Sequence, residues 1–276
     1  MATSYRQILV HLDSGRRIAP AVQCARRIAQ EQGAALAAFD VARPALTTIP
    51  DVAGLGGLTA AALVELEEER RKFVRDTFDQ AMANRGPAAR FGEMSGFGLA
   101  RAFAHQALHA DLLVLSQPHP DTGPGEAPHD FNEDVMAASG KPALVLPAVG
   151  QMPESFRTVV IAWKPAREAA AAVNGAMPLL QRAAKVHIVA WGSGADDGVP
   201  LNLDGYLRSH GVAAQWHLRG DEPAELGQLL LSQAFDLGAD LLVMGCYGHG
   251  RAREWVMGGV SRTVLRSMTL PVLMAN

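Results

Sequence analysis

The stretch Ala-Asp-Leu-Leu-Val occupies residues 110–114 and returns unchanged at 239–243, an offset of 129 residues. At the same offset, Pro-Ala-Leu-Val-Leu from Pro142 is matched by Pro-Val-Leu-Met-Ala from Pro271. Two matched segments at one offset indicate an internal repeat, which decides the architecture before any single element is assigned. The sequence therefore predicts two tandem copies of one domain.

The two copies differ in length near their starts. Residues 5–10 and 156–161 also match, but at an offset of 151, so the first copy holds about 22 additional residues. A Pro/Gly/Thr-rich stretch at 43–58 and a long helical pattern at 59–84 account for them. The second copy has only the shorter segment 200–210 at this place.

Each copy alternates short apolar runs with helical patterns, which is typical of parallel βαβ units in an open, helix-covered sheet. We therefore expect an α/β fold of two domains, each with a five-stranded parallel sheet and helices on both faces. The predicted domains are 1–148 and 156–276, joined by a linker at 149–155. In the second copy the predicted strands are 158–163, 186–191, 213–218, 240–244 and 271–275, and the predicted helices are 167–183, 200–210, one starting at 221–223, and 255–267.

Composition excludes several classes of protein. The formal net charge of −3 provides no basic footprint for nucleic acid or for an anionic membrane surface. Two isolated cysteines argue against a disulfide framework. Neither a signal-peptide apolar segment nor an 18-residue apolar run occurs in the sequence. We expect a soluble, cytoplasmic protein.

A glycine-rich loop follows the predicted strand 240–244, at the strand end where open α/β sheets bind ligands. It reads Gly245-Cys-Tyr-Gly-His-Gly-Arg-Ala-Arg-Glu-Trp-Val-Met-Gly-Gly-Val-Ser261. Gly245 and Gly248 would let the backbone approach a ligand and adopt positive φ. Amides at the start of the following helix would bind an anion. Arg251 and Arg253 add positive charge, and the hydroxyl of Ser261 adds a donor or a helix cap.

Gly245-x2-Gly248-x9-Gly258-Gly259-Val-Ser, followed by a short helix into Pro-Val-Leu, resembles the universal stress protein family. The first copy shares the family's opening strand at 8–15 and its ending at 141–145, so the resemblance covers essentially the whole chain as a tandem member. It implies Rossmann-like, adenine-nucleotide alpha-hydrolase-type domains. It also implies that the second copy binds one ATP or other adenine nucleotide per chain, with or without Mg²⁺.

Carried over position by position, the resemblance assigns glycines to a phosphate cradle, backbone amides to the phosphates, and three positions to the nucleoside. The nucleotide-site residues so assigned are Ala162, Lys164, Trp191, Met244, Gly245, Gly248, Gly250, Arg251, Gly258, Gly259, Val260 and Ser261. Two of them depart from the family pattern. Gly259 stands where Ser or Thr is frequent, and Lys164 replaces an acidic residue that accepts hydrogen bonds from the nucleotide. A lysine accepts none, so Lys164 weakens nucleoside recognition, favours phosphate charge or marks a lost site.

The corresponding loop of the first copy aligns without gaps and has lost every cradle glycine. The replacements are Ser116, His119, His129 and Asp130, and four prolines remove backbone donors. A carboxylate at Asp130 would repel a phosphate. We expect no nucleotide in the first copy.

Other candidate groups are weaker. His105 and His109, four residues apart, could bind zinc with His119 and His129, although surface histidines are the more ordinary interpretation. Cys246 would be either a small loop residue or a thiol of lowered pKa. Trp163 and Trp191 would either enclose a base or cap the sheet.

The predicted function is stress-response nucleotide sensing by the second domain, with a structural first domain. The two domains would form an intramolecular pseudo-dimer, and whole chains could pair as a homodimer. No nucleophile elbow or Walker lysine occurs, so at most weak ATP hydrolysis is expected. The alternative is a non-nucleotide adaptor protein with both sites degenerate.

Overall fold

The structure is a computed structural model, and its contacts divide the chain into two compact units. The N-terminal unit is Tyr5–Ser139, and the C-terminal unit is Gly140–Asn276 together with Met1–Ser4. The domain limits expected from the sequence, 1–148 and 156–276, remain predictions. The structure describes residues 3–13, 17–41, 60–83, 86–96, 98–118, 130–150, 152–192, 201–221, 223–246 and 259–276.

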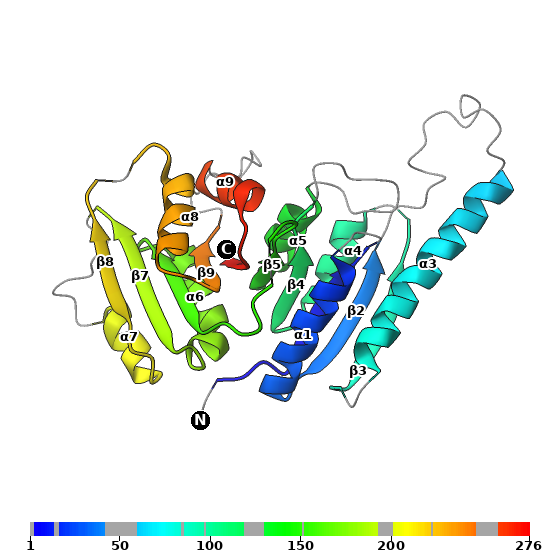
Figure 1. Cartoon of the computed structure of the whole chain (residues 1–276), viewed down its shortest axis with the longest axis horizontal. Helices are drawn as coiled ribbons and strands as arrows, with labels where there is room; N and C mark the ends of the chain where they lie inside the picture. Colours follow the sequence, from blue (N-terminus) through cyan, green and yellow to red (C-terminus); the bar gives the residue numbers. More distant parts are fainter. Residues whose placement is uncertain are drawn as a thin grey trace. The chain divides into compact units, whose positions relative to one another are not determined.

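The N-terminal unit is a parallel sheet of strand order β3-β2-β1-β4 with helices between the strands (Figure 1). Its strands are β1 (Gln7–Leu12), β2 (Ala35–Val41), β3 (Ala89–Met94) and β4 (Leu112–Ser116). Its described helices are α1 (Ile18–Gln32), α3 (Ala60–Met82), α4 (Leu99–Ala107) and α5 (Phe131–Ser139).

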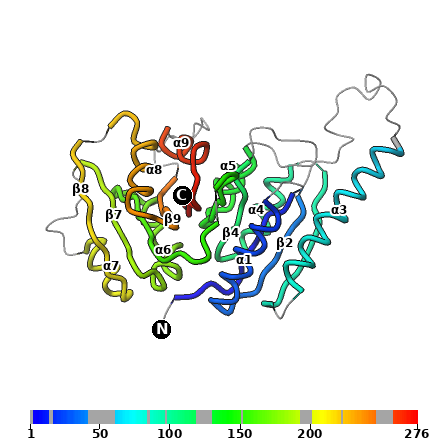
Figure 2. Tube along the Cα trace, in the orientation of Figure 1, coloured from blue at the N-terminus to red at the C-terminus, as the bar shows by residue number. Residues whose placement is uncertain are grey.

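The C-terminal unit is a sheet of strand order β5-β10-β9-β6-β7-β8. Figure 2 shows the C-terminus of the chain next to β9, as the pairing of β10 with β9 requires. Its strands are β5 (Ala143–Leu146), β6 (Thr158–Trp163), β7 (Lys185–Trp191), β8 (Gln215–Arg219), β9 (Leu241–Gly245) and β10 (Val272–Ala275). Its described helices are α6 (Arg167–Leu180), α7 (Leu203–Ser209), α8 (Leu226–Asp236) and α9 (Gly259–Ser267).

The predicted α/β class with open, mostly parallel sheets is confirmed, and each repeat contributes five of the described strands. The strand that differs is β5, which pairs antiparallel with β10. The register places Val145 opposite Val272 and Ala143 opposite Met274, so equivalent positions of the two repeats pair reciprocally around Leu144 and Leu273. Such self-complementary pairing has local twofold symmetry. It also covers two short strands that would otherwise present unpaired edges.

The strand pairing agrees with the sequence offsets. Val10 lies opposite Val114 in the first repeat, and Ile161 lies opposite Val243 in the second. The repeated Leu-Leu-Val runs form β4 and β9, whose first four residues are buried, as expected of strands covered on both faces. Several predicted boundaries shift by a few residues; for example, α8 begins at Leu226 rather than at 221–223.

Each unit reverses its strand order once, at β1/β4 and at β6/β9. Right-handed crossovers then place the helices before and after the reversal on opposite faces of the sheet. The helix contacts agree, because α1 packs with α3, α4 with α5, and α8 with α9. Gly33 ends α1 in the left-handed conformation with φ of 67°, which costs glycine little. Among the described helices, none is long and apolar enough to cross a membrane.

Candidate functional site

Three of the predicted site residues lie at the carboxyl edge of the C-terminal sheet, on one face. Ala162, near the end of β6, pairs with Met244 in β9, and Trp191 ends the neighbouring strand β7. Alternation places all three side chains on the same face, because Ala162 also lies opposite Val189 in β7. Helix α8 packs on this face, where Gln233 accepts a hydrogen bond from Arg219. The edge lies at the strand-order reversal, where open α/β sheets bind ligands.

Gly245 ends β9 on the opposite face, against the first turn of α6. A Cβ atom built there would lie 2.6 Å from the amide nitrogen of Ala169 and 2.7 Å from the carbonyl carbon of Glu168. The expected positive φ is wrong for Gly245, which has extended strand geometry and is absent from the described glycines of positive φ. The position requires glycine because a helix backbone touches it, so a packing constraint alone explains this cradle residue.

Gly259 begins α9 in a different environment. No atom of the described chain lies within 4 Å of the place where its Cβ would be, so packing within the protein does not require glycine here. Val260 follows, half-buried, and Ser261 is buried in the first turn. Helix α9 is held from beneath by Gly227 of α8, whose Cβ would come within 2.7 Å of Thr263. The start of α9 is therefore fixed in position and open above Gly259, which fits an anion at a helix N-terminus.

Of the remaining predicted residues, the structure describes only Lys164. Lys164 follows β6 directly and is exposed. Predictions for Gly248, Gly250, Arg251 and Gly258 fall outside the described residues.

The two tryptophans do not enclose one ligand. Trp163 pairs with Ala190, and Trp191 is the next residue along β7, so alternation directs the two indoles to opposite faces of the sheet. The interpretation of a base held between them is wrong. Within the described chain, the buried indole nitrogen of Trp163 has no hydrogen-bond partner, so this face of the edge holds an unsatisfied donor.

Cys246 is not an activated thiol. Its side chain is 1% exposed, and burial, followed by the charge of nearby Glu168, raises the pKa of the thiol far above its usual range. A nucleophilic cysteine requires the opposite shift. The structure favours the interpretation of a small residue that fits beside α6.

At the equivalent edge of the N-terminal unit, rings fill the space over β1. The offset of 151 places His11 where the other unit has Ala162, and the offset of 129 places Phe131 at the position of Val260. The imidazole of His11 lies 4.3 Å from the ring of Phe131 and 5.7 Å from that of Phe103, between centroids. Its Nε2 lies 3.3 Å from the carbonyl oxygen of Val41. Burial lowers the pKa of His11, so the ring is neutral and donates through this nitrogen.

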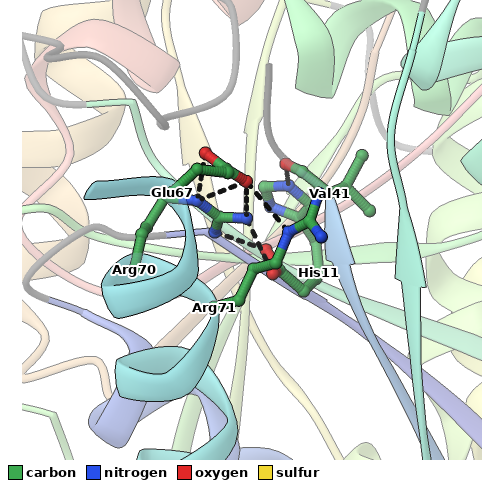
Figure 3. Close-up of polar contacts among 6 residues, drawn as sticks. His11, Val41, Glu67, Arg70 and Arg71 are labelled. Atoms are coloured by element: carbon green, nitrogen blue, oxygen red, sulfur yellow. Dashed lines mark hydrogen bonds and ion pairs between the residues drawn. The ribbon is translucent and has the colours of Figure 1, made fainter. Parts of the chain in front are cut away.

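An ion network occupies the other face of the same edge (Figure 3). The guanidinium of Arg70, on α3, donates to both carboxylate oxygens of Asp40 at 2.8 and 2.9 Å. It also donates to Glu67 at 3.0 Å, and Arg71 donates to the same Glu67 oxygen at 3.1 Å. The side chains of Asp40 and Arg70 are 2% and 11% exposed, so water screens this pair little.

The pKa values of the two acids in this network, Asp40 and Glu67, shift in opposite directions. Burial raises the pKa of Asp40 above its usual range, and the two hydrogen bonds from Arg70 offset only part of that rise. Burial acts on Glu67 too, but the hydrogen bonds and charges of Arg70 and Arg71 outweigh it and lower the pKa. The sequence does not reveal this network, because Arg70 and its partner Asp40 lie 30 residues apart in the chain.

Among the described residues, no group of three or more His, Cys, Asp or Glu side chains could hold a metal ion. His105 and His109 face each other edge-on with ring centroids 6.4 Å apart. His119 and His129 lie outside the described residues. No sequence pattern indicates a second histidine pair, His187 and His217, because the two residues lie on different strands and become neighbours only in the folded sheet.

Comparison with known proteins places the second repeat in a family. The model of the universal stress protein family matches residues 160–276, and no curated protein sequence matches the chain. A universal stress protein from Archaeoglobus fulgidus DSM 4304 has a similar structure at 14% identity, with 98% of both chains covered and a TM-score of 0.67.

Two further structures come from Pseudomonas aeruginosa. The functionally unknown protein PA1789 from strain PAO1 matches at 16% identity with a TM-score of 0.58, and a putative universal stress protein from strain UCBPP-PA14 at 17% and 0.56. Each covers 98% of this chain and 92% of its own. At these identities the likeness shows the fold, which extends over both repeats. Residues 160–276 therefore belong to the universal stress protein family, and the whole chain has the fold of its tandem two-domain members.

Proposed function

We propose that this chain is a cytoplasmic stress-response protein that binds one adenine nucleotide through its C-terminal unit. The ligand would lie at the carboxyl edge of β6, β7 and β9, with its phosphates over the start of α9. The N-terminal unit would serve as the structural half of the chain. The proposal includes no efficient catalysis, and slow ATP hydrolysis would be at most a side activity.

The observation that carries this proposal is the contrast between two equivalent sheet edges. Among the described residues of the C-terminal unit, the small residues Ala162 and Gly259 stand at this edge, and no other described element lies within 4 Å of the Cβ position of Gly259. In the N-terminal unit, His11 and Phe131 fill the position on one face, and the Arg70 network fills the other. Small residues at a strand-order reversal suit a ligand, whereas in the N-terminal unit rings and buried ion pairs occupy the equivalent positions.

The charge near the edge favours a phosphorylated ligand. Lys164 replaces the hydrogen-bond acceptor that the family resemblance leads one to expect, and its ammonium can only donate. We therefore propose that recognition depends more on the phosphates than on the nucleoside, with ATP, with or without Mg²⁺, preferred over AMP.

The number of ligands per chain is the first test. Nucleotide-free protein titrated calorimetrically with ATP should saturate at one nucleotide per chain, because one of the two edges is filled. Binding to the native state alone should also raise the melting temperature. At a ligand concentration 100-fold above Kd, it adds about 2.7 kcal/mol to the free energy of unfolding. Saturation at two nucleotides would contradict the assignment of the N-terminal unit.

An adaptor without a nucleotide remains the competing function, favoured by Lys164. It predicts no heat and no thermal shift with ATP, ADP, AMP or inorganic phosphate at millimolar concentration. That result would exclude the nucleotide proposal.

Lys164→Ala should weaken ATP binding more than AMP binding. An exposed ammonium contributes modestly to a phosphate contact, so we expect about a three- to tenfold loss for ATP and a smaller loss for AMP. Lys185→Ala is the matched control, because Lys185 is exposed at the opposite, amino-terminal end of β7. Equal losses for both nucleotides, or an equal effect of the control, would show that Lys164 does not contact the phosphates.

A further inference from the structure

His187 on β7 and His217 on β8 form a close cross-strand pair. The Nδ1 of His187 lies 3.0 Å from the Nε2 of His217, and the ring centroids are 5.0 Å apart. The register places Gln215 opposite His187 and places His217 opposite Val189, so the three polar side chains project from one face of the sheet. Both rings are half-buried, which leaves them accessible from solvent.

The environment keeps both imidazoles neutral. Burial lowers the pKa of His187, and the neighbouring His217 and Lys185 lower it further. Burial and the charge of Arg219 lower the pKa of His217. In neutral imidazole one nitrogen is protonated and the other carries a lone pair, so the pair shares one N–H···N hydrogen bond. For a metal to bind both facing nitrogens, the donating ring changes to the tautomer that is protonated on its other nitrogen. Neutral imidazole is also the form that binds metal ions.

From this geometry we propose that His187 and His217 form a chelating site for a divalent transition metal, Ni(II) or Cu(II). A metal bonded to both nitrogens at about 2.0–2.1 Å, with the nitrogens 3.0 Å apart, would make an N–metal–N angle of about 95°. That angle is close to the right angle between neighbouring ligands of square-planar or octahedral Ni(II) and Cu(II). A tetrahedral zinc site would require an angle of about 109° and nitrogens about 3.4 Å apart.

The remaining coordination positions would be filled by neutral oxygen donors. Gln215 is exposed, lies opposite His187 and is two residues from His217 along β8. Its side-chain amide oxygen would be one such donor, and water would fill the other positions. Lys185 and Arg219 oppose a cation here, so we expect a site of moderate affinity that is reversible under chelation. The site lies on β7 and β8 and requires no nucleotide, so it is independent of the proposed function.

The test is a calorimetric titration of the tag-free full chain with NiCl₂ at pH 7.5. We expect one equivalent to bind through the pair, and His217→Gln and His187→Gln each to lower the affinity by about tenfold or more, because each removes one of the two imidazole ligands. Far-UV circular dichroism verifies that each variant is folded. The matched control is His105→Gln/His109→Gln, which removes a second close histidine pair among the described residues and should leave the affinity of this site unchanged.

Cu(II) paramagnetic resonance provides a second readout. The wild-type complex should show hyperfine coupling to two imidazole nitrogens, and His217→Gln should show one fewer. Unchanged Ni(II) affinity in both single variants, or loss of the bound equivalent in the His105/His109 control, would overturn the proposal.

Discussion

Arg70→Ala is expected to lower the free energy of unfolding by about 3–5 kcal/mol at neutral pH, because it leaves a buried carboxylate without its partner. Asp40 is 2% exposed, and both of its carboxylate oxygens accept hydrogen bonds from Arg70. Glu67 loses a bond to the same guanidinium and retains one from Arg71. Urea denaturation of the wild-type and variant chains measures the loss.

The defect should be larger at pH 7.5 than at pH 5. Without Arg70, burial and the charges of Glu93 and Glu67, all of which raise the pKa of Asp40, act without opposition, so the pKa should rise further. A group whose folded pKa lies above its unfolded value, about 3.9, stabilises the fold at low pH and loses this contribution as pH rises through the folded pKa. In the wild type, the lowered pKa of Glu67 acts in the reverse sense, and its contribution is lost as pH falls.

The control is Arg208→Ala on α7. Arg208 pairs with Asp204 at 3.0 Å, but the two side chains are 74% and 32% exposed, so we expect a change of about 0.5 kcal/mol or less. Adding Asp40→Asn to Arg70→Ala should recover part of the loss, because the amide is neutral. Similar small effects of Arg70→Ala and Arg208→Ala would show that α3 is not fixed by this network.

Gly245→Ala is expected to cost about 1–3 kcal/mol of stability, the usual range for overpacking. The new methyl group would lie 2.6–2.7 Å from backbone atoms of Glu168 and Ala169, and a helix backbone cannot move aside as a flexible side chain can. Either β9 or the first turn of α6 must shift. The shift would also displace the adjacent Met244 and reduce nucleotide binding.

Gly259→Ala separates stability from binding. Open space surrounds the Cβ position of Gly259, so we expect stability to change by about 0.5 kcal/mol or less. Any loss of ATP affinity in this variant would then report the ligand itself. An unchanged urea midpoint for Gly245→Ala would contradict the close contact between β9 and α6.

Much of the fold follows from short-range pattern. The repeat at residues 110–114 and 239–243 predicted two copies, and their apolar runs predicted β4 and β9. The end of α1 is an example: Gly33 stops the helix, and its apolar periodicity marks the buried face. Both signals depend only on residues close together in the sequence. The antiparallel pairing of β5 with β10 could not be predicted in this way, since partner choice joins residues more than 120 positions apart.

For the candidate site the division is similar. The sequence by itself predicted where a ligand would bind, because a parallel strand followed by glycines and a helix start places backbone amides at a known sheet edge. Only the tertiary structure decided that the backbone of α6 leaves no room for a side chain at Gly245, that Asp40 pairs with Arg70, and that His187 contacts His217. These contacts depend on which strands and helices become neighbours, and that choice is made by the packing of the whole domain rather than by any local pattern.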